Sequence, residues 1–282
     1  MRVLTNINSL NQLLDNSRVN NKIIGFVPTM GALHEGHLSL LKLAQKDCDE
    51  IVCSIFINPT QFNDSNDLEN YPITIEEDIK LLEEISCDIL FLPNVTEMYP
   101  QGLYAKQYQL NGVDKVLEGE KRPGHFDGVC TIVHRLFSIV KPNIAYFGEK
   151  DFQQVAVIKQ MVNSLSLPIQ IKTGKTIRDK DGLAKSSRNT LLSTTQRKKA
   201  TYIYASLQKM KFLYGKVDCP QLKEMIKDDI NKAQDMQLDY VEIVNPQSFR
   251  PLQGKGTNED AVALMAVFLG KVRLIDNLSL ND

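Results

Sequence analysis

Two histidines three positions apart, His34 and His37, are the residues whose type and spacing most directly predict chemistry. They lie in the segment PTMGALHEGH at residues 28–37, between an apolar run that predicts a strand and a periodic pattern that predicts a helix. Side chains three apart on a helical turn face the same side, and the first turn of a helix offers unpaired N–H groups to phosphate. The segment therefore predicts a site where two imidazoles stabilise negative charge developing on an α-phosphate.

Two other interpretations of the histidine pair stay open at the level of sequence. The pair could lie on the surface of a glycine-containing loop, or it could bind zinc. A helical zinc pair favours a spacing of four residues and needs a third ligand, and the remaining histidines, His125 and His134, show no partner arrangement. Zinc is therefore the weaker of these two alternatives.

A second segment, KSSR at residues 185–188, places two cations and two hydroxyls within four positions. A loop of this kind can fold over a triphosphate, pair its charges with the leaving pyrophosphate and exclude water. A solvated basic hinge would have the same composition. The presence of the histidine segment in the same chain favours the interpretation of KSSR as a loop that covers a triphosphate.

The elements that must position these segments follow from apolar patterns. In the first 170 or so residues, short apolar runs that predict buried strands alternate with helical periodicity. Strands are predicted at 23–28, 51–57, 89–92, 145–147 and 169–171, and helices at 37–48, 75–85, 128–140 and 152–165. This alternation predicts an α/β fold, a doubly wound, Rossmann-like domain around a parallel sheet.

The pattern changes after Lys172, where a loop at 174–189 carries Gly, Lys and Arg. Beyond it, helices are predicted at 195–214 and 221–234, and strands at 239–244, 261–268 and 272–275. We therefore predict two domains, at residues 1–175 and 176–282. The second is a smaller mixed α/β C-terminal domain that could act as a lid, hinged near residues 174–178.

Composition excludes several classes of protein. Lys and Arg total 33 against 34 for Asp and Glu, so the formal charge is −1 and no global electrostatic argument favours nucleic acid or a membrane surface as partner. The longest apolar stretches, 51–57 and 261–270, are far shorter than the roughly 20 residues that span a bilayer. The five cysteines include no C-x-x-C pair, which predicts small buried side chains in a reducing, cytoplasmic setting.

Five separated stretches resemble the pantoate–β-alanine ligase family, within the nucleotidylyltransferases that carry an HxGH signature. They are PTMGALHEGHLSL, FINPTQFN, FLPNVTEMYP, RPGHFDGVCTIVHRLFSIVKPNIAYFGEKDFQQ and IRDKDGLAKSSRN, in family order. The resemblance implies that ATP and (R)-pantoate form a pantoyl adenylate and pyrophosphate, and that β-alanine then attacks to give pantothenate and AMP. It also implies Mg²⁺ with the ATP, a homodimer, a nucleotide- and pantoate-binding domain at 1–175 and a lid at 176–282.

The resemblance also assigns catalytic and binding roles to matching positions. His37 is implied as the proton donor and His34 as its neighbour on the phosphates. Gln61 is implied to bind both pantoate and β-alanine, although an exposed loop amide would fit the same sequence, and Gln154 is implied as the second pantoate ligand. The residues implied to bind ATP are Met30, Gly31, Ala32, Leu33, His34, Glu35, Gly36, His37, Gly148, Glu149, Lys150, Asp151, Ile177, Lys185, Ser186, Ser187 and Arg188.

Some positions depart from the family pattern or permit a second interpretation. Lys185 stands where the family commonly has Met, and we hypothesise that its charge raises the affinity for ATP. Ile73 replaces an Arg that is frequent after Tyr-Pro. Glu77 and Asp78 stand where some members have aspartates assigned to magnesium, but two acids in a first helical turn also suit the helix dipole. The metal ligands are therefore left unassigned, and Asp151 is expected either to cap a helix or to orient the ribose.

Two other functions remain as alternatives. A related nucleotidylyltransferase would attach AMP or CMP to a phosphate-bearing acceptor and would not depend on an amine. A nucleotide-binding regulatory protein would bind ATP without releasing pyrophosphate. The expected homodimer is assigned a surface at 113–117 or 126–137, on the apolar residues that both segments carry.

Overall fold

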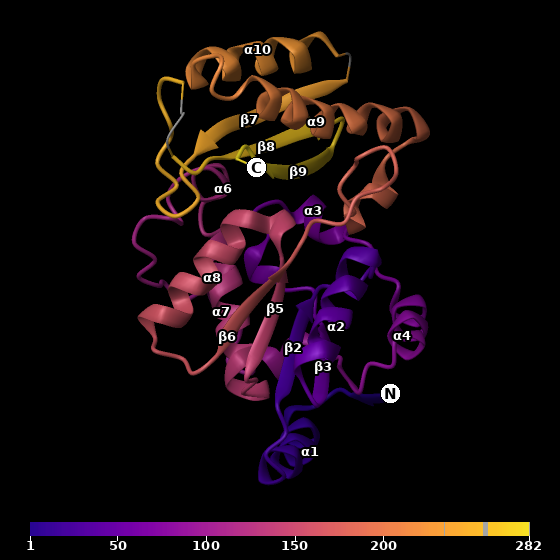
Figure 1. Cartoon of the computed structure of the whole chain (residues 1–282). Coiled ribbons are helices and arrows are strands. Elements are labelled where there is room, and N and C mark those ends of the chain that lie inside the picture. Colours follow the sequence, from indigo (N-terminus) through magenta and orange to yellow (C-terminus); the bar gives the residue numbers. More distant parts are fainter. Residues whose placement is uncertain (234, 256–258, 282) are drawn as a thin grey trace. The chain divides into compact units, whose positions relative to one another are not determined.

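The computed structural model describes residues 1–233, 235–255 and 259–281. The chain divides into two compact units, Met1–Lys175 and Thr176–Asp282 (Figure 1). Positions 234 and 282, which end the predicted helix at 221–234 and the predicted domain at 176–282, lie outside the described residues.

A six-stranded sheet forms the centre of the first unit, and all of its neighbouring strands are parallel. Its strands are β1 (Arg2–Leu4), β2 (Ile24–Thr29), β3 (Glu50–Ile55), β4 (Ile89–Phe91), β5 (Ile144–Gly148) and β6 (Gln170–Gly174). Their order is β1-β4-β3-β2-β5-β6, so the chain moves outward in one direction from β2 and in the other from β5. The predicted doubly wound α/β architecture is confirmed.

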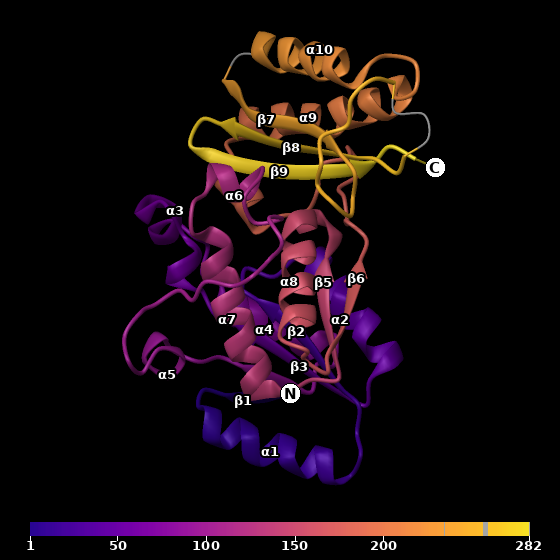
Figure 2. The same cartoon turned by 90° about the vertical axis from the view of Figure 1, so that its left-hand side faces the viewer.

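Helices cover both faces of this sheet (Figure 1 and Figure 2). On one face lie α1 (Ile7–Val19), α7 (His125–Val140) and α8 (Phe152–Ser164), and on the other lie α2 (Glu35–Asp47) and α4 (Ile75–Glu84). Successive strand residues point to opposite faces. In β2, Phe26 therefore packs with the first group of helices and Val27 with the second. Burial on both faces explains why these strands appear in the sequence as continuous apolar runs.

Two elements at the N-terminus were not predicted. β1 has three residues, and α1 buries only Leu10, Leu14 and Ser17 of its 13 residues. So short a strand and so narrow an apolar stripe leave little periodicity in the sequence.

Two predicted helices begin earlier than expected. α2 begins at Glu35 rather than His37, because His34 caps it, and α7 begins at His125 rather than Gly128. The shorter elements are η1 (Pro59–Gln61), α3 (Ser65–Glu69), α5 (Val95–Met98), α6 (Glu118–Lys121) and η2 (Glu149–Asp151).

The second unit holds a three-stranded antiparallel sheet in the order β7-β8-β9. Its elements are η3 (Ser187–Leu191), α9 (Thr194–Leu213), α10 (Cys219–Lys232), β7 (Met236–Val244), β8 (Val262–Leu269) and β9 (Val272–Ser279). The core between helices and sheet includes Leu207, Ile226 and Met265, all fully buried. The predicted small mixed α/β unit is confirmed.

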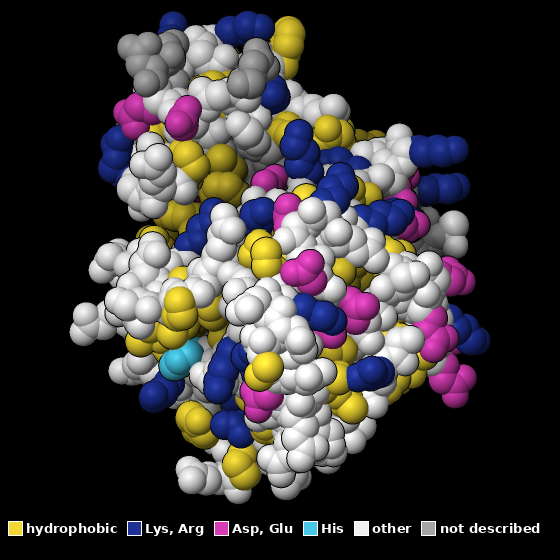
Figure 3. Space-filling view, turned by 60° about the horizontal axis from the view of Figure 1, so that its bottom comes forward, with side chains coloured by type: hydrophobic (Ala, Val, Ile, Leu, Met, Phe, Trp, Pro, Cys, Tyr) yellow, Lys and Arg dark blue, Asp and Glu magenta, His cyan; other side chains and the backbone are white. Residues whose placement is uncertain are grey.

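Surface and cysteine features complete the description. On the face drawn in Figure 3, basic and acidic side chains are interspersed. All five cysteines are free thiols, and only Cys48 is not fully buried, as expected for small core side chains. No helix within the described part of the chain is long and apolar enough to cross a membrane.

Close packing of α7 against η1 depends on Gly128. A Cβ at this position would lie 2.3 Å from the carbonyl oxygen of Thr60 and 2.8 Å from the Cα of Gln61. Both neighbours are backbone atoms, which cannot turn aside as a side chain can. Asn58 Nδ2 also donates a hydrogen bond to the Gly128 carbonyl at 3.2 Å. Glycine therefore lets the helix approach the segment that carries Gln61.

We expect Gly128→Ala to lower the free energy of unfolding by about 1–3 kcal/mol, because the added methyl group forces two backbone segments apart. Alanine is the better helix former by about 1 kcal/mol, so propensity alone predicts the opposite sign. Urea unfolding measures the difference. Ser138→Ala, at an exposed position of the same helix, is the control and should stay within about 0.5 kcal/mol of the parent. Unchanged stability of Gly128→Ala would contradict this packing argument.

Candidate active site

The predicted chemical segments of the first unit meet at the carboxyl ends of β2 and β5. These strands are neighbours, with Gly25 opposite Ile144 and Phe26 opposite Ala145. β2 leads into α2 through residues 30–34, and β5 leads into α8 through η2. The direction of winding reverses between the two strands, and open α/β sheets bind ligands at such a point.

The two histidines form the N-terminal cap of α2. His34 Nδ1 accepts a hydrogen bond from the Gly36 N–H at 3.1 Å, and His37 Nδ1 accepts one from the His34 N–H at 3.4 Å. Their ring centroids are 4.1 Å apart. Because each Nδ1 accepts, each neutral ring carries its hydrogen on Nε2. The pair thus places two Nε2–H donors at a helix N-terminus, an arrangement that suits phosphate oxygens.

The protonation state of His37 follows from its surroundings. The protein atoms packed around the half-buried ring desolvate it and lower its pKa to about 3, and the neighbouring His34 and Lys150 act in the same direction. The Asp151 carboxylate opposes them. At neutral pH His37 is therefore uncharged unless a further anion lies beside it, and it donates a hydrogen bond rather than a proton.

The segment that leads into the histidines is held by a buried carboxylate. Asp78 of α4 accepts hydrogen bonds from the N–H groups of Ala32 at 2.9 Å and Leu33 at 2.7 Å, and from the Thr74 hydroxyl at 3.2 Å. Gly31 and Ala32 have positive φ values, 82° and 47°. Glycine adopts such a conformation readily, whereas for Ala32 it is unfavourable. The two bonds to Asp78 stabilise this strained turn and so set where α2 begins.

Asp78 is therefore the anchor of the histidine segment. Its side chain has no exposed surface, and both of its oxygens accept hydrogen bonds. Glu77, its neighbour in the first turn of α4, is exposed. Residues 1–233, 235–255 and 259–281 contain no group of three or more His, Cys, Asp or Glu placed to hold a metal ion.

At the end of β5, the side chains of η2 turn toward different partners. The Lys150 ammonium lies 3.2 Å from the Asp151 carboxylate, and both groups act on the pKa of His37. Asp151 occupies the N-cap position of α8, but its side chain makes no capping hydrogen bond, so the capping interpretation is wrong. Glu149 accepts a hydrogen bond from the Thr173 hydroxyl on β6 at 2.9 Å.

The two glutamines implied to bind pantoate come from η1 and α8. Gln61 is half-buried, with its Oε1 accepting from Asn58 Nδ2 at 3.1 Å and its Nε2 lying 3.1 Å from Met30 Sδ. It lies against the histidine segment and is not an exposed loop amide. Gln154 is also half-buried, and within the described residues its amide makes no hydrogen bond, which leaves its donors and acceptor for a ligand.

Two residues without a predicted role hold Gln61 in place. Asn58 is 1% exposed, and its Oδ1 accepts hydrogen bonds from the Tyr99 hydroxyl at 2.6 Å and the Thr60 hydroxyl at 3.1 Å. Asn58 and Tyr99 both belong to stretches that carry the family resemblance, and this was the sign in the sequence that they contribute to the site. Their contact joins positions 41 apart, and no local pattern indicates it.

In the second unit, the residues that lead into the KSSR segment form a hairpin, with Arg178 bridged to Ala184 in antiparallel fashion. Arg178 forms a bidentate pair with the buried Asp276, at 2.6 and 2.9 Å. The Lys185 N–H donates to the Ile177 carbonyl at 2.8 Å and closes the hairpin. The Lys185 ammonium lies 2.7 Å from the Asp179 carboxylate, which balances part of the positive charge of Lys185.

The remaining residues of the KSSR segment begin η3. Ser186 is its N-cap, and the Ser186 hydroxyl accepts a hydrogen bond from the Arg188 N–H at 3.3 Å. Ser187 is buried. Ile177 and residues 185–188 thus share one ordered turn of the second unit, whereas the histidines, the glutamines and the β5 residues belong to the first.

Comparison with known sequences gives a consistent result. The sequence profile of the family described as "Pantoate-beta-alanine ligase" matches residues 2–279. The chain is 45% identical to the pantothenate synthetase of Fervidobacterium nodosum, with 100% of both chains covered. It is 47% identical over 276 residues to the pantothenate synthetase of Aquifex aeolicus, covering 96% of each. These matches confirm the resemblance seen in the five stretches.

Solved structures agree with the sequences. The crystal structure of pantothenate synthetase from Thermus thermophilus superposes with a TM-score of 0.92 at 38% identity, covering all of both chains. The pantoate-beta-alanine ligase of Francisella tularensis, complexed with beta-gamma ATP and beta-alanine, gives a TM-score of 0.83 at 38% identity and covers 99% of this chain and 98% of that one.

We expect Asp78→Asn to lower the free energy of unfolding by about 1.5–3 kcal/mol. The Ala32 and Leu33 N–H groups bind different oxygens of the carboxylate, and in asparagine one of these oxygens becomes an NH₂ group that cannot accept a hydrogen bond. Urea unfolding with a chelator present excludes any contribution from metal binding. Glu77→Gln makes the same charge change on an exposed neighbour and should shift stability by less than about 0.5 kcal/mol. Equal stability of the two variants would contradict the anchoring role.

The lowered pKa of His37 predicts a definite pH dependence. Between pH 6.5 and about 3 the unfolded chain binds a proton at His37 that the folded protein does not. The contribution of His37 to the free energy of unfolding therefore decreases as the pH falls through this window and is constant above it. Ring ¹⁵N chemical shifts should show a neutral His37 at pH 5, with a higher pKa in Lys150→Met and a lower one in Asp151→Asn. Titration near pH 6.5 in the unmodified protein would disprove this.

Proposed function

Because the chain belongs to the pantoate–β-alanine ligase family, we propose that it condenses (R)-pantoate with β-alanine, consuming ATP and yielding pantothenate, AMP and pyrophosphate. The observation that supports this proposal most directly is the pair of Nε2–H donors on His34 and His37, at the N-terminus of α2 and beside Lys150. The Francisella tularensis relative, complexed with beta-gamma ATP and beta-alanine, supports the choice of two of the three substrates.

The first step that we propose forms a pantoyl adenylate. A carboxylate oxygen of pantoate attacks the α-phosphorus of ATP, and the bond from that phosphorus to the bridging oxygen of pyrophosphate breaks. Negative charge grows on the phosphate oxygens during this displacement. Donors fixed in advance, such as the two imidazole N–H groups and the Lys150 ammonium, stabilise that charge without reorganising. Gly148, Glu149, Asp151 and the turn at 30–33 would line the nucleotide site.

In the second step the amine of β-alanine attacks the acyl carbon of the adenylate. A C–N bond forms, the bond from the acyl carbon to the oxygen of AMP breaks, and the nitrogen gives up a proton. The amides of Gln61 and Gln154 can bind hydroxyl and carboxylate groups without adding charge, which suits pantoate and β-alanine. Gln61 would contact both acids.

His37 acts as a proton donor in this scheme only with help from the substrate. With a pKa of about 3, the ring is neutral at pH 7 and offers a hydrogen bond. A polyphosphate beside the ring would raise its pKa, because an adjacent anion favours the imidazolium. We therefore propose that hydrogen bonding to phosphate oxygens is its first role, and that proton transfer follows ATP binding.

Magnesium enters this scheme as part of the ATP substrate. No group of three metal-binding side chains is found within the described part of the chain, and the Asp78 carboxylate is occupied by backbone N–H groups. Mg²⁺ is commonly held by substrate phosphates with few protein ligands. We therefore assign no residue of this chain to the metal.

We assign substrate binding to the first unit and a covering role to the second. A pantoyl adenylate hydrolyses if water reaches it, so a lid carrying Ile177 and residues 185–188 would protect it. The Asp179–Lys185 ion pair reduces the extra charge of Lys185, so a raised affinity for ATP remains a hypothesis. The homodimer and the cytoplasmic location also remain predictions.

The test combines the purified protein with MgATP and (R)-pantoate, with and without β-alanine. We expect pyrophosphate release, AMP and pantothenate that depend on β-alanine, and transfer of one ¹⁸O from labelled pantoate carboxylate to AMP. Gln154→Ala should lower kcat/KM for pantoate at least tenfold, whereas Gln160→Ala on the same helix should stay within twofold. ATP binding without pyrophosphate release would favour a regulatory protein, and turnover only with a phosphate-bearing acceptor would favour another nucleotidylyltransferase.

A further inference from the structure

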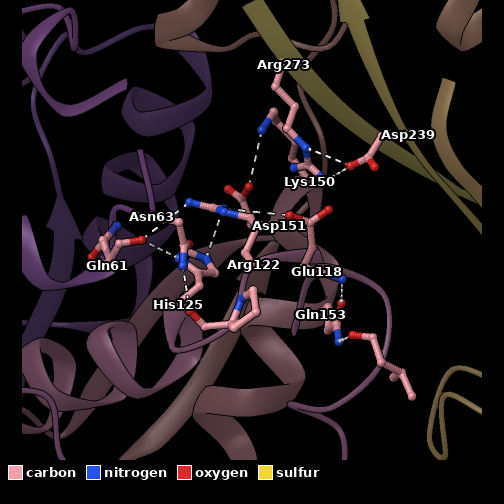
Figure 4. A network of polar contacts seen from close by, with 12 residues as sticks. Gln61, Asn63, Glu118, Arg122, His125, Lys150, Asp151, Gln153, Asp239 and Arg273 are labelled. Atoms are coloured by element: carbon pink, nitrogen blue, oxygen red, sulfur yellow. Dashed lines mark hydrogen bonds and ion pairs between the residues drawn. The ribbon is translucent and has the colours of Figure 1, made fainter. Parts of the chain in front are cut away.

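The backbone of Gln61 is held by two side chains that no part of the proposed mechanism uses. His125 Nδ1 lies 2.8 Å from the Gln61 carbonyl oxygen, and Arg122 Nη2 lies 3.4 Å from the same oxygen (Figure 4). Arg122 Nη1 also lies 3.1 Å from His125 Nε2. The three residues therefore form a closed triangle of polar contacts.

The triangle determines the tautomer of His125. A guanidinium group only donates, so the contact with Arg122 requires Nε2 to accept. The hydrogen of the neutral ring is then on Nδ1, where it is donated to the Gln61 carbonyl. His125 is 6% exposed, so water does not compete effectively for either nitrogen. The ring is a rigid link of fixed orientation between the start of α7 and Gln61.

The Gln61 carbonyl needs such a donor. It ends η1, a helical segment of three residues, and terminal carbonyls have no partner within their own helix. The orientation of this carbonyl fixes the peptide that follows Gln61 and the direction in which its side chain leaves the backbone. The contact of Gly128 with Thr60 and Gln61 brings the start of α7 close enough for His125 to reach.

The same network continues toward Gln154, the second glutamine implied to bind pantoate. Arg122 Nη1 lies 3.7 Å from the Glu118 carboxylate, and the Glu118 N–H donates to Gln153 Oε1 at 3.1 Å (Figure 4). Gln153 is 2% exposed and precedes Gln154 on α8. A chain of buried and half-buried polar contacts thus runs from Gln61 to Gln153, the residue beside Gln154.

We propose that His125 is a positioning residue for pantoate binding, acting through the Gln61 carbonyl, with Arg122 fixing its tautomer. The inference rests on the proposed function, in which Gln61 binds pantoate. It assigns to His125 an effect on one substrate, whereas a general structural role would affect pantoate and ATP alike.

The experiment compares three substitutions in the full-length protein by steady-state kinetics and thermal unfolding. His125→Leu removes the donor and should raise KM for pantoate at least tenfold, with KM for ATP changed less than twofold. His125→Asn places an amide N–H near the former Nδ1 and should restore KM for pantoate to within threefold of the parent. His134→Leu, on the same helix and bonded to Tyr108, is the matched control and should leave both KM values unchanged.

A double-substitution test separates positioning from general disruption. In a Gln61→Ala background, His125→Leu should raise KM for pantoate less than twofold further, because the group it positions is absent. If His125→Leu does not fold, His125→Gln replaces it with the same expectation, since its amide lies near the former Nε2 and loses the bond to Gln61.

The outcomes distinguish this inference from the function on which it rests. If the parent protein makes no pantothenate, both fail. If the parent is active but the folded donor-deficient variant keeps its KM for pantoate, or has both KM values raised equally, only the positioning role of His125 is overturned. A tenfold effect that persists in the Gln61→Ala background also overturns it.

Discussion

The pairing of β2 with β5 is the constraint on which the rest of the site depends. Parallel strands cannot be joined by a tight turn, so each connection crosses over a face of the sheet, and the two halves wind away from β2 and β5 in opposite directions. The carboxyl ends of β2 and β5 are therefore adjacent, and the connections that follow them diverge, which leaves space for a ligand between them. One connection begins with the histidine segment and the other with Lys150 and Asp151, and their proximity is visible in the effect of both residues on the pKa of His37.

Around this point the protein relies on oriented neutral donors as much as on charge. The cap of α2 gives His34 and His37 the same tautomer, and the shielding of His37 from water keeps it uncharged. A neutral N–H donor costs less to bury than a cation, and it becomes more basic when an anion approaches. The anionic substrate thereby supplies the condition under which the ring can carry a proton. The Asp78 carboxylate stabilises the strained turn at Gly31 and Ala32, which precedes the two histidines.

The glutamine side of the site is built by contacts between elements rather than within them. Asn58 holds the Gln61 side chain and His125 holds the Gln61 backbone, and both depend on the approach of α7 that Gly128 permits. Buried polar groups of this kind are costly when unpaired, so a network that satisfies them selects one arrangement of the backbone. The continuation through Glu118 to Gln153 couples that arrangement to α8.

The sequence by itself determined the architecture. Strands buried on both faces must be apolar throughout, and helices on a sheet must carry an apolar stripe, so the parallel sheet and the small second unit were predictable from local patterns. The histidine pair could be recognised because its spacing and its place before a helix are also local. β1 and α1 were missed because a three-residue strand and a narrow apolar stripe leave little pattern. Only the tertiary structure decided that Asp78 anchors a turn 45 residues away, that Asp151 does not cap its helix, and that His125 reaches Gln61 across 64 positions. Such roles depend on which atoms meet after folding, and a side chain's partner is not encoded in its neighbours along the chain.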